Sequence, residues 1–492
     1  MPVYYLEIIV VVLGLLMLMV DAFAKLDDKR SIASIGIIGL IVVFGLLFKV
    51  VPPESTEGVF WQFYSAGDQT ALFFKGIAVL TTLIVLIMAS DFSPIVVRQT
   101  ADPEPGAHPQ AGLGEFFALP MFACAGLMWM ASANNLVSIF VSLETVTITF
   151  YILVAYLRRN VGSLEAGVKY LILGALSTGF LVYGFAWLFG ITGSMQLSEI
   201  ATALADPSIN TTAAFFAFAL ILVAVAFKVG GAPFHFWIPD VYQGAPTPIT
   251  AFLSVGSKAA GFIVFLRLVD PFLASAPLVG KVTTVLSVIA ILTLLMGNLA
   301  AMPQKNFKRL LAYSSVAHAG FLIMALASSP DASAAGQSMS PTTVISFYLG
   351  AYLLMTLLAF LVMTTVRGQV AGEDLNAYKG LAKRSPFLAF TLLISMASLA
   401  GIPLTAGFFG KFFVFKLAAE QQNWTLLVVG LIGAAAGFYY YLKIAVSMFF
   451  ESSDDDALAI PVRTTTRIAM IALTIAIIAV GINPGLILGL LP

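Results

Sequence analysis

Long apolar stretches, each about the length of a membrane span, follow one another along almost the whole chain. A helix needs roughly 20 residues to cross the hydrocarbon core of a bilayer. About fourteen stretches of that size are separated by short polar or Pro- and Gly-rich segments such as VPPESTEG, DPEPGAHPQAGLG, SSPDASAAGQS and ESSDDD. The pattern predicts an all-α polytopic membrane protein of about 14 transmembrane helices.

Composition agrees with this class and limits the chemistry that the chain can perform. Of 492 residues, 60% are hydrophobic and 10% are charged, whereas soluble domains are typically about a quarter charged. The single cysteine, Cys124, can neither form an internal disulfide nor supply the thiolate set of an iron–sulfur cluster. The usual Gly-rich nucleotide fingerprint is not found either. If the protein takes part in redox chemistry, we expect other chains to hold the electrons.

The basic residues indicate how the chain is oriented. Of the 25 Lys and Arg residues, fifteen fall in the odd-numbered loops, and positive charge is typical of cytoplasmic loops. We therefore expect a bacterial inner-membrane protein with both termini on the outer, periplasmic side. The even-numbered sides have only Lys49, Lys75, Arg267 and Lys281, all predicted at or near helix ends. The basic residues of the odd-numbered loops are Lys25, Lys29, Arg30, Arg98, Arg158, Arg159, Lys305, Lys308, Arg309, Arg367, Lys379, Lys383, Arg384, Arg463 and Arg467.

The seventh predicted span ends in an unusual way. The apolar run AAFFAFALILVAVA leads into FKVGGAPFHFWIPD, residues 227–240. Pro233 and Pro239 have no N–H to continue the helix, and two glycines loosen the same turn. The helix is therefore predicted to break beside Lys228, as helices do at the ion sites of many transporters. A simple proline kink is the alternative, but it does not explain the lysine.

The twelfth predicted span has breakers of the same kind. GIPLTAGFFGKFFVF places Pro403 and three glycines just before Lys411. Two interrupted helices, each with a deep lysine, suggest two inverted repeats of five helices. The corresponding division is an N-terminal three-helix segment over 1–110, one repeat over 111–272, a second over 273–450, and a C-terminal helix over 451–492.

Several charges fall within predicted spans. A lysine at the centre of a membrane helix costs about 2.5–3.5 kcal/mol, and a buried carboxylate needs a partner or a proton. Lysines near helix ends can reach the membrane surface, which is a sufficient explanation for Lys416 and Lys443. Lys169 has Glu165 four residues before it, so a local ion pair explains it equally well. The deep charges that favour a role in moving charge are Glu144, Lys228, Lys258 and Lys411.

Three segments resemble one known family. FKVGGAPFHFWIPDVYQGAPTPITAFLSVGSKAAGF (227–262), KNFKRLLAYSSVAHAGF (305–321) and GIPLTAGFFGKF (401–412) are similar to the antiporter-like membrane subunits of respiratory complex I, the proton-pumping NADH-quinone oxidoreductase. Within that family, PFHFWIPDVYQGAPTP followed by LSVGSK is most similar to the N subunits, the counterparts of mitochondrial subunit 2. The resemblance extends over nearly the whole chain in length and number of spans.

The resemblance implies a role for each deep charge. Glu144 matches the glutamate of the fifth helix that pairs with a lysine of the broken seventh helix, here Lys228. Lys258 matches the eighth-helix lysine on the central hydrophilic axis, and Lys411 matches the lysine of the broken twelfth helix. The resemblance also implies secondary positions on the proton axis at Lys169, His235 and His318, although a packing role explains His318 equally well.

The function implied by the resemblance is proton translocation along this buried Glu/Lys/His axis, driven by quinone reduction in neighbouring subunits. The chain itself is then expected to bind no cofactor, with flavin, iron–sulfur clusters and quinone in other subunits. Expected partners are other antiporter-like subunits, small membrane subunits, lipids and the transported proton, and no nucleic acid. The polar segment 366–385 is expected to pack on a partner subunit or on lipid headgroups.

Two other functions remain open from the sequence. Subunits of multisubunit cation/proton antiporters share this fold, and for such a protein Na⁺ would matter. A passive membrane scaffold is the other alternative, but four deep charges argue against it.

Overall fold

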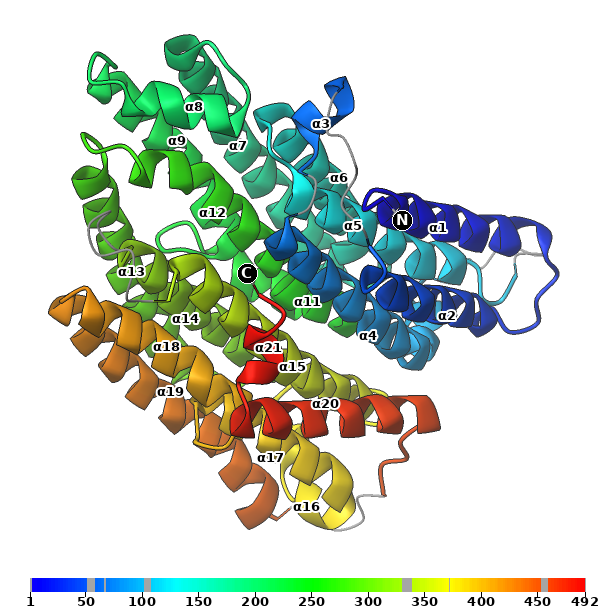
Figure 1. Cartoon of the computed structure of the whole chain (residues 1–492). Coiled ribbons are helices and arrows are strands. Elements are labelled where there is room, and N and C mark those ends of the chain that lie inside the picture. The colour runs from blue at the N-terminus through cyan, green and yellow to red at the C-terminus, as the bar shows by residue number, and fades with distance from the viewer. Residues whose placement is uncertain are drawn as a thin grey trace.

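The computed structural model describes residues 2–50, 58–65, 68–100, 108–329, 339–370, 372–452 and 459–491. Its regular elements are helices, and isolated bridges are the only β pairing in this described part of the chain. Figure 1 shows the helices packed side by side, with α1 (Tyr5–Phe23) and α2 (Arg30–Leu47) on one flank and α19 (Trp424–Phe450) on another. The predicted all-α class is confirmed.

Within the ranges that the structure describes, thirteen helices are long and apolar enough to cross a membrane. The twelfth predicted span is formed instead by two shorter helices, so the prediction of about fourteen spans is also confirmed. After α1 and α2, the spans are α4 (Gln69–Thr100), α5 (Leu113–Ser132), α6 (Leu136–Val154), α7 (Val161–Thr192), α9 (Thr211–Val229), the continuous stretch of α11 (Thr247–Phe252), η1 (Leu253–Ser257) and α12 (Lys258–Leu273), then α13 (Val279–Ala301), α14 (Phe307–Ala327), α15 (Pro341–Arg367), α17 (Pro386–Ala400) with α18 (Ala406–Glu420), α19 and α20 (Thr464–Ile482). The remaining helices are α3 (Val59–Phe63), α8 (Leu197–Ala205), α10 (Trp237–Gly244), η2 (Leu375–Tyr378), α16 (Leu381–Arg384) and α21 (Gly485–Leu488).

Contacts between loops show that successive spans run in opposite directions. Odd-numbered loops contact one another at one end of the bundle, and even-numbered loops contact one another at the other end. On the odd side, the Arg159 amide donates to the carbonyl of Gln99 at 3.1 Å, and Asn306 forms an isolated bridge with Asp374. On the even side, the Leu136 amide donates to the carbonyl of Met195 at 3.0 Å. Parts of the predicted polar loops lie outside the described residues, namely 51–57, 101–107, 330–338 and 453–458.

The core lies around α12, α14 and α15. In each of these spans 94% of the most apolar window is buried, against 28% for α1 and α2 and 33% for α7. The outer helices carry exposed apolar side chains such as Val12, Ile38 and Ile172. Such an outer surface suits lipid tails or neighbouring membrane helices rather than water. The chain is therefore a multi-pass membrane protein in which the deep lysines Lys258 and Lys411 are buried.

The seventh span breaks where the sequence predicts it. Helix α9 ends at Val229, Gly230 takes a left-handed φ of 86°, and α10 begins only at Trp237. The break frees backbone groups that need new partners inside a membrane protein. The indole N–H of Trp237 donates to the Phe227 carbonyl at 2.9 Å, and the Ala232 amide donates to Thr293 Oγ1 at 2.9 Å. The break is thus hydrogen-bonded and fixed in place.

The twelfth span also breaks as predicted. Helix α17 ends at Ala400, Gly401 takes a φ of 87°, and α18 begins at Ala406. The amide of Gly407 donates to Ser398 Oγ at 3.1 Å across the break. Whether the two broken helices belong to inverted repeats, and whether 1–110, 111–272, 273–450 and 451–492 are separate units, stay predictions.

Lys75 lies in the second turn of α4, near a helix end as predicted, but its side chain is not exposed there. Its side chain is fully buried in α4, where Nζ lies 2.6 Å from Oε1 of Glu7 on α1. The hydroxyl of Tyr64 contacts both groups. The hydropathy pattern predicts where Lys75 lies along its own span. The burial of the Lys75 side chain depends instead on α1 and Tyr64, which pack against it from distant parts of the sequence. The pair joins the first span to the third.

Removing one member of this buried ion pair is expected to be costly. Lys75→Met leaves the Glu7 carboxylate buried without its cation, a change that typically costs about 3–5 kcal/mol. The double variant Glu7→Gln/Lys75→Met removes both charges and should recover most of that stability. The midpoint of thermal unfolding of the purified complex containing each variant measures the effect. If the single variant were as stable as the wild type, the Glu7–Lys75 ion pair would not be needed to stabilise the fold.

Candidate functional site

The structure places Glu144 and Lys228 on neighbouring helices but does not join them by an ion pair. Glu144, on α6, accepts a hydrogen bond from Thr178 Oγ1 of α7 at 2.8 Å. Lys228, in the last turn of α9, donates to Thr147 Oγ1 of α6 at 2.6 Å. The pairing implied by the sequence is therefore replaced, in the described part of the chain, by two separate hydrogen bonds to threonines.

A small cavity lies between these groups. It has a volume of about 10 Å³ and is lined by Thr178, the donor to Glu144, and by Lys228. A single water needs roughly 10–15 Å³ of such space, so the cavity is at the lower limit for one. Thr147 follows Glu144 by three residues and therefore lies on the same face of α6. The partner of the ammonium, Thr147, thus lies one turn from Glu144, and the partner of the carboxylate, Thr178, shares this cavity with Lys228.

Lys258 begins α12, directly after the π-helical turn η1, a geometry that is frequent at functional sites. Its side chain is only 2% exposed. Nζ donates to both the carbonyl and the hydroxyl of Ser315 on α14 and lies 5.7 Å from the ring centre of Tyr352. In the described residues no carboxylate forms an ion pair with it. The lysine is therefore held at the centre of the protein by neutral groups.

His318 lies one turn after Ser315 on the same helix and is also 2% exposed. Its Nδ1 lies 2.7 Å from the hydroxyl of Tyr348, and its Nε2 lies 3.0 Å from that of Tyr441. Ser315, three residues before His318, contacts Lys258, and Phe321, three residues after it, contacts Lys411. The structure therefore places His318 between the two lysines, hydrogen-bonded to two tyrosines.

Lys411 lies within the broken twelfth span, on α18, and is 6% exposed. Its Nζ donates to the carbonyls of Leu399 and Ala400 at 3.0 and 2.8 Å. These two residues are the last of α17. A helix leaves its final carbonyls without partners, and a cation there is favourable. Nζ also lies 5.4 Å from the ring centre of Phe321 on α14. The break in the span is what makes these carbonyls available to the lysine.

Two secondary candidates, His235 and Lys169, have no contact with Lys258, His318 or Lys411 in the described residues. His235 is 3% exposed in the segment between α9 and α10, and its Nδ1 has no partner in the part of the chain that the structure describes. Lys169 forms the predicted ion pair with Glu165 at 2.7 Å and a further one with Asp240 at 2.9 Å. It lies about 13 Å along α7 from Thr178, the partner of Glu144.

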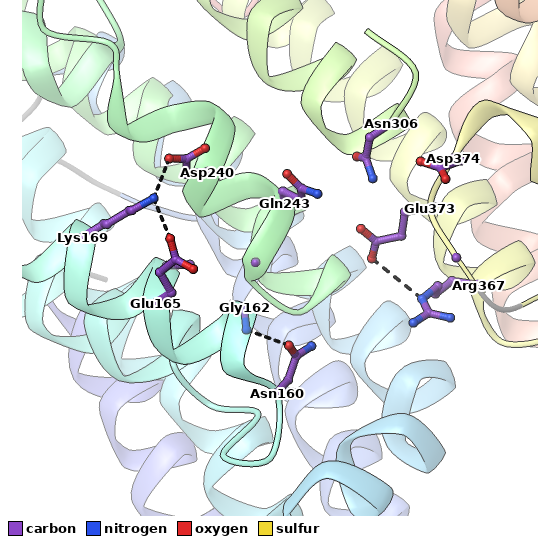
Figure 2. A pocket seen from close by; sticks show the side chains of 13 residues that line it. Asn160, Gly162, Glu165, Lys169, Asp240, Gln243, Asn306, Arg367, Glu373 and Asp374 are labelled. Carbon is purple, nitrogen blue, oxygen red and sulfur yellow. Dashed lines mark hydrogen bonds and ion pairs between the residues drawn. The ribbon is translucent and has the colours of Figure 1, made fainter.

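Lys169 belongs instead to a polar cavity on the side of the odd-numbered loops. Figure 2 shows Lys169 and Asp240 on one wall and Glu373 with Arg367 across from them. The cavity has a volume of about 540 Å³. Asp240, on α10, also pairs with Arg309 of α14 at 2.8 Å. These pairs hold the short second half of the seventh span between α7 and α14.

The arrangement is suited to moving protons rather than binding a molecule. Lysine, histidine, tyrosine and serine side chains lie close together around Lys258 and His318, and each can hold or pass a proton. A lysine releases its proton near neutral pH only where its surroundings disfavour the ammonium form. The partners of Lys258 and Lys411 in the described residues are neutral oxygens, so neither lysine is held in an ion pair.

The sequence did not identify the groups that connect the lysines. These are hydroxyl-bearing side chains, which give no hydropathy signal because they are common in any membrane helix. A helical spacing was available for one of them, since Ser315 precedes His318 by three residues in the motif AYSSVAHAGF. The connecting residues are Thr147, Thr178, Ser315, Tyr348, Tyr352 and Tyr441.

Comparison with known proteins gives consistent matches. The family model described as NADH:quinone oxidoreductase/Mrp antiporter, TM matches residues 133–437. NADH-quinone oxidoreductase subunit N of Trichlorobacter lovleyi is 35% identical over 485 residues, covering 98% of this chain and 94% of that protein. A chain of respiratory complex I from Thermus thermophilus superposes with a TM-score of 0.78 at 31% identity, covering 99% of both chains. A chain of the Mrp complex from Dietzia sp. has a TM-score of 0.77 at 19% identity, covering 99% of this chain and 96% of that one, a likeness of fold alone.

Proposed function

Because this chain belongs to the NADH:quinone oxidoreductase/Mrp antiporter transmembrane family, we propose that it is the N-type membrane subunit of an NADH-quinone oxidoreductase and translocates protons. It is thus part of an enzyme, although the redox reaction takes place in other subunits. The single observation that supports the proposal is the set of titratable side chains deep in the protein, with Lys228 beside Thr147 and with Lys258, His318 and Lys411 buried around α14. The set extends from one broken helix to the other.

The proposed step begins at Glu144 and Lys228. In the present arrangement Lys228 donates to Thr147 and is not paired with the carboxylate. A carboxylate that moves next to Lys228 favours its ammonium form, and one that moves away or takes a proton lets Lys228 release its proton toward Lys258. Ser315, His318 and the tyrosines then carry the charge on to Lys411. Exchange with one side of the membrane takes place at Lys411 through the broken helix.

The surface around Glu144 supports a protein partner in the membrane. Glu144 is partly exposed, and its neighbours on the outer face of α6, Val141 and Ile148, are 55% and 54% exposed. A carboxylate at this depth is too costly to face lipid. We propose that another membrane subunit covers the α6–α7 face and transmits the effect of quinone reduction to Glu144.

The remaining expectations complete the proposal. Flavin, iron–sulfur clusters and quinone belong to other subunits, and the proton is the ion that this chain handles. The odd-numbered loops face the cytoplasm of a bacterial cell and both termini face outward, which the distribution of Lys and Arg supports. Antiporter-like and small membrane subunits, together with lipids, are the neighbours.

The test is proton uptake by proteoliposomes that contain the intact purified complex, with quinone reduction followed in parallel. For Lys228→Ala we expect both coupled activities to fall by about a hundredfold or more, since a positioned proton-transfer group typically contributes about 10²–10⁴-fold. Lys416→Ala is the matched control, because that lysine is 48% exposed beside Glu420 and should be dispensable. Unchanged pumping and reduction in Lys228→Ala would reduce the broken helix to a structural feature.

A further inference from the structure

An apolar groove opens between α2, α4, α15 and the C-terminal segment that begins with α21. It has a volume of about 320 Å³ and is lined by apolar side chains such as Phe44, Leu72 and Leu353. Two of the lining residues, Phe48 and Leu490, are 68% and 49% exposed, so the groove is open to the surroundings of the protein. Figure 1 shows that α4 and α21 both lie against α15, although they come from opposite ends of the chain. The groove is separate from the buried lysines of the proposed proton path.

The groove has the length of one leaflet of a bilayer. Its lining on α4 runs from Gln69 to Leu80, eleven positions or about 16 Å of helix. Half of a hydrocarbon core is about 15 Å thick. Gln69 begins α4 at the even-loop end of the bundle, and its Nε2 lies 3.5 Å from the carbonyl oxygen of Leu490. The groove therefore extends from the even-loop surface to about the middle of the membrane.

The groove is too narrow for a helix of another protein. A volume of about 320 Å³ spread over about 16 Å gives a mean cross-section of about 20 Å². A helix with its side chains is about 10 Å wide and needs roughly 80 Å². A single extended hydrocarbon chain is one methylene wide and can enter a space of this width. Dispersion contacts with the walls favour such a chain over empty space.

The even-loop end of the groove carries a positive charge. Lys49 directly follows Phe48, which lines the groove after the end of α2, and the lysine is exposed. A lysine near a membrane surface attracts anionic lipid headgroups. Asp68, next to Gln69 at the same end, already forms an ion pair with Arg267. The charge of Lys49 is therefore complementary to a phosphate group at this end.

We propose that the groove binds one acyl chain of an anionic phospholipid from the leaflet on the even-loop side. The chain lies along α4, between α2 and α15, and the headgroup phosphate lies beside Lys49. The bound lipid then connects the first helices of the protein to α15 and to the C-terminal segment. This inference depends on the membrane location of the protein and not on the proposed transfer of protons.

The test uses the intact complex in proteoliposomes that contain phosphatidylglycerol with a photoreactive diazirine on one acyl chain. Gly76→Leu should fill the groove, because Gly76 lines it and only Leu47 Cδ1, at 3.9 Å, lies within 4 Å of an added Cβ. Leucine is also the better helix former, so the variant should fold. The matched control is Gly45→Leu on α2, which does not line the groove and has no described atom within 4 Å of the added Cβ.

After illumination, mass spectrometry of this chain locates the lipid adducts. In the wild type and in Gly45→Leu, adducts should form at groove residues such as Phe73 and Leu353. In Gly76→Leu these adducts should decrease by about tenfold or more, which corresponds to a loss of about 1.4 kcal/mol or more of binding free energy. Equal labelling of the groove in the two leucine variants, or no labelling of the groove in the wild type, would overturn the proposal.

Two further measurements test the headgroup and the class of ligand. With diazirine-labelled phosphatidylcholine for comparison, Lys49→Gln should lower the preference for phosphatidylglycerol about fivefold. An unchanged preference would overturn the assignment to an anionic lipid. The photoreactive residue p-benzoylphenylalanine in place of Phe73 should cross-link to lipid. If it cross-links to another subunit instead, a protein covers the groove and the proposal is wrong.

Discussion

Lys258→Leu is expected to abolish proton pumping while leaving the fold as stable as before, or more stable. The lysine is buried without a carboxylate partner in the described residues, and its hydrogen bonds go to Ser315. Replacing a buried charge by an apolar side chain of similar size is often neutral or stabilising. A group that passes protons typically contributes about 10²–10⁴-fold to a rate. Stability and function should therefore change in opposite directions.

The measurement is the same proton-uptake assay, combined with thermal unfolding of the purified complex. Lys281→Leu is the control, since Lys281 lies exposed at the start of α13 and should affect neither quantity. Lys258→His tests the chemistry directly, because imidazole also binds and releases a proton near neutral pH. It should retain more pumping than leucine does. Equal loss in both variants, or normal pumping in the leucine variant, would argue that Lys258 does not carry protons.

Much of the fold could be predicted because the membrane limits what a chain can do. Backbone groups in lipid must be paired within helices, so apolar length and the positions of proline and glycine almost determine the spans. The breaks beside Lys228 and Lys411 follow from Pro233 and from the glycines that precede Lys411. The deep lysines could be found for the same reason, since a charge within a span is costly.

The parts that the sequence missed depend on contacts between distant segments. Lys75 and Lys308 both lie near the ends of their spans, where a lysine can usually reach water, yet they are 0% and 2% exposed. Their carboxylate partners, Glu7 and Glu373, lie 68 and 65 positions away in the sequence. Hydropathy along one helix cannot reveal such partners.

The relation between Glu144 and Lys228 shows a different limit. The sequence places both at membrane depth on helices that can meet, which is what the structure has. Which atoms touch depends on side-chain rotamers, and threonines of α6 and α7 take the hydrogen bonds that an ion pair would use. A residue pattern can predict that two charges are neighbours, but not which of two hydrogen-bonding arrangements is populated.

Gly407→Ala is expected to be the most damaging change at a position without a functional group. A Cβ at this position would lie 1.8 Å from the backbone oxygen of Ser398, a distance that no neighbouring side chain can relieve by moving. Helices α17 and α18 would have to separate, and Lys411 would lose its bonds to the carbonyls of Leu399 and Ala400. Overpacking of this kind costs about 1–3 kcal/mol or more.

We expect Gly407→Ala to lower pumping by about a hundredfold or more, as removal of a proton-transfer group would, even though the lysine itself is unchanged. The matched control is Gly45→Ala on α2, where no atom lies within 4 Å of the added Cβ. It should pump normally, since alanine is the better helix former. If Gly407→Ala assembles and pumps like the wild type, the contact of Lys411 with the end of α17 is not needed. The broken helix would then serve to bend the chain rather than to hold the lysine.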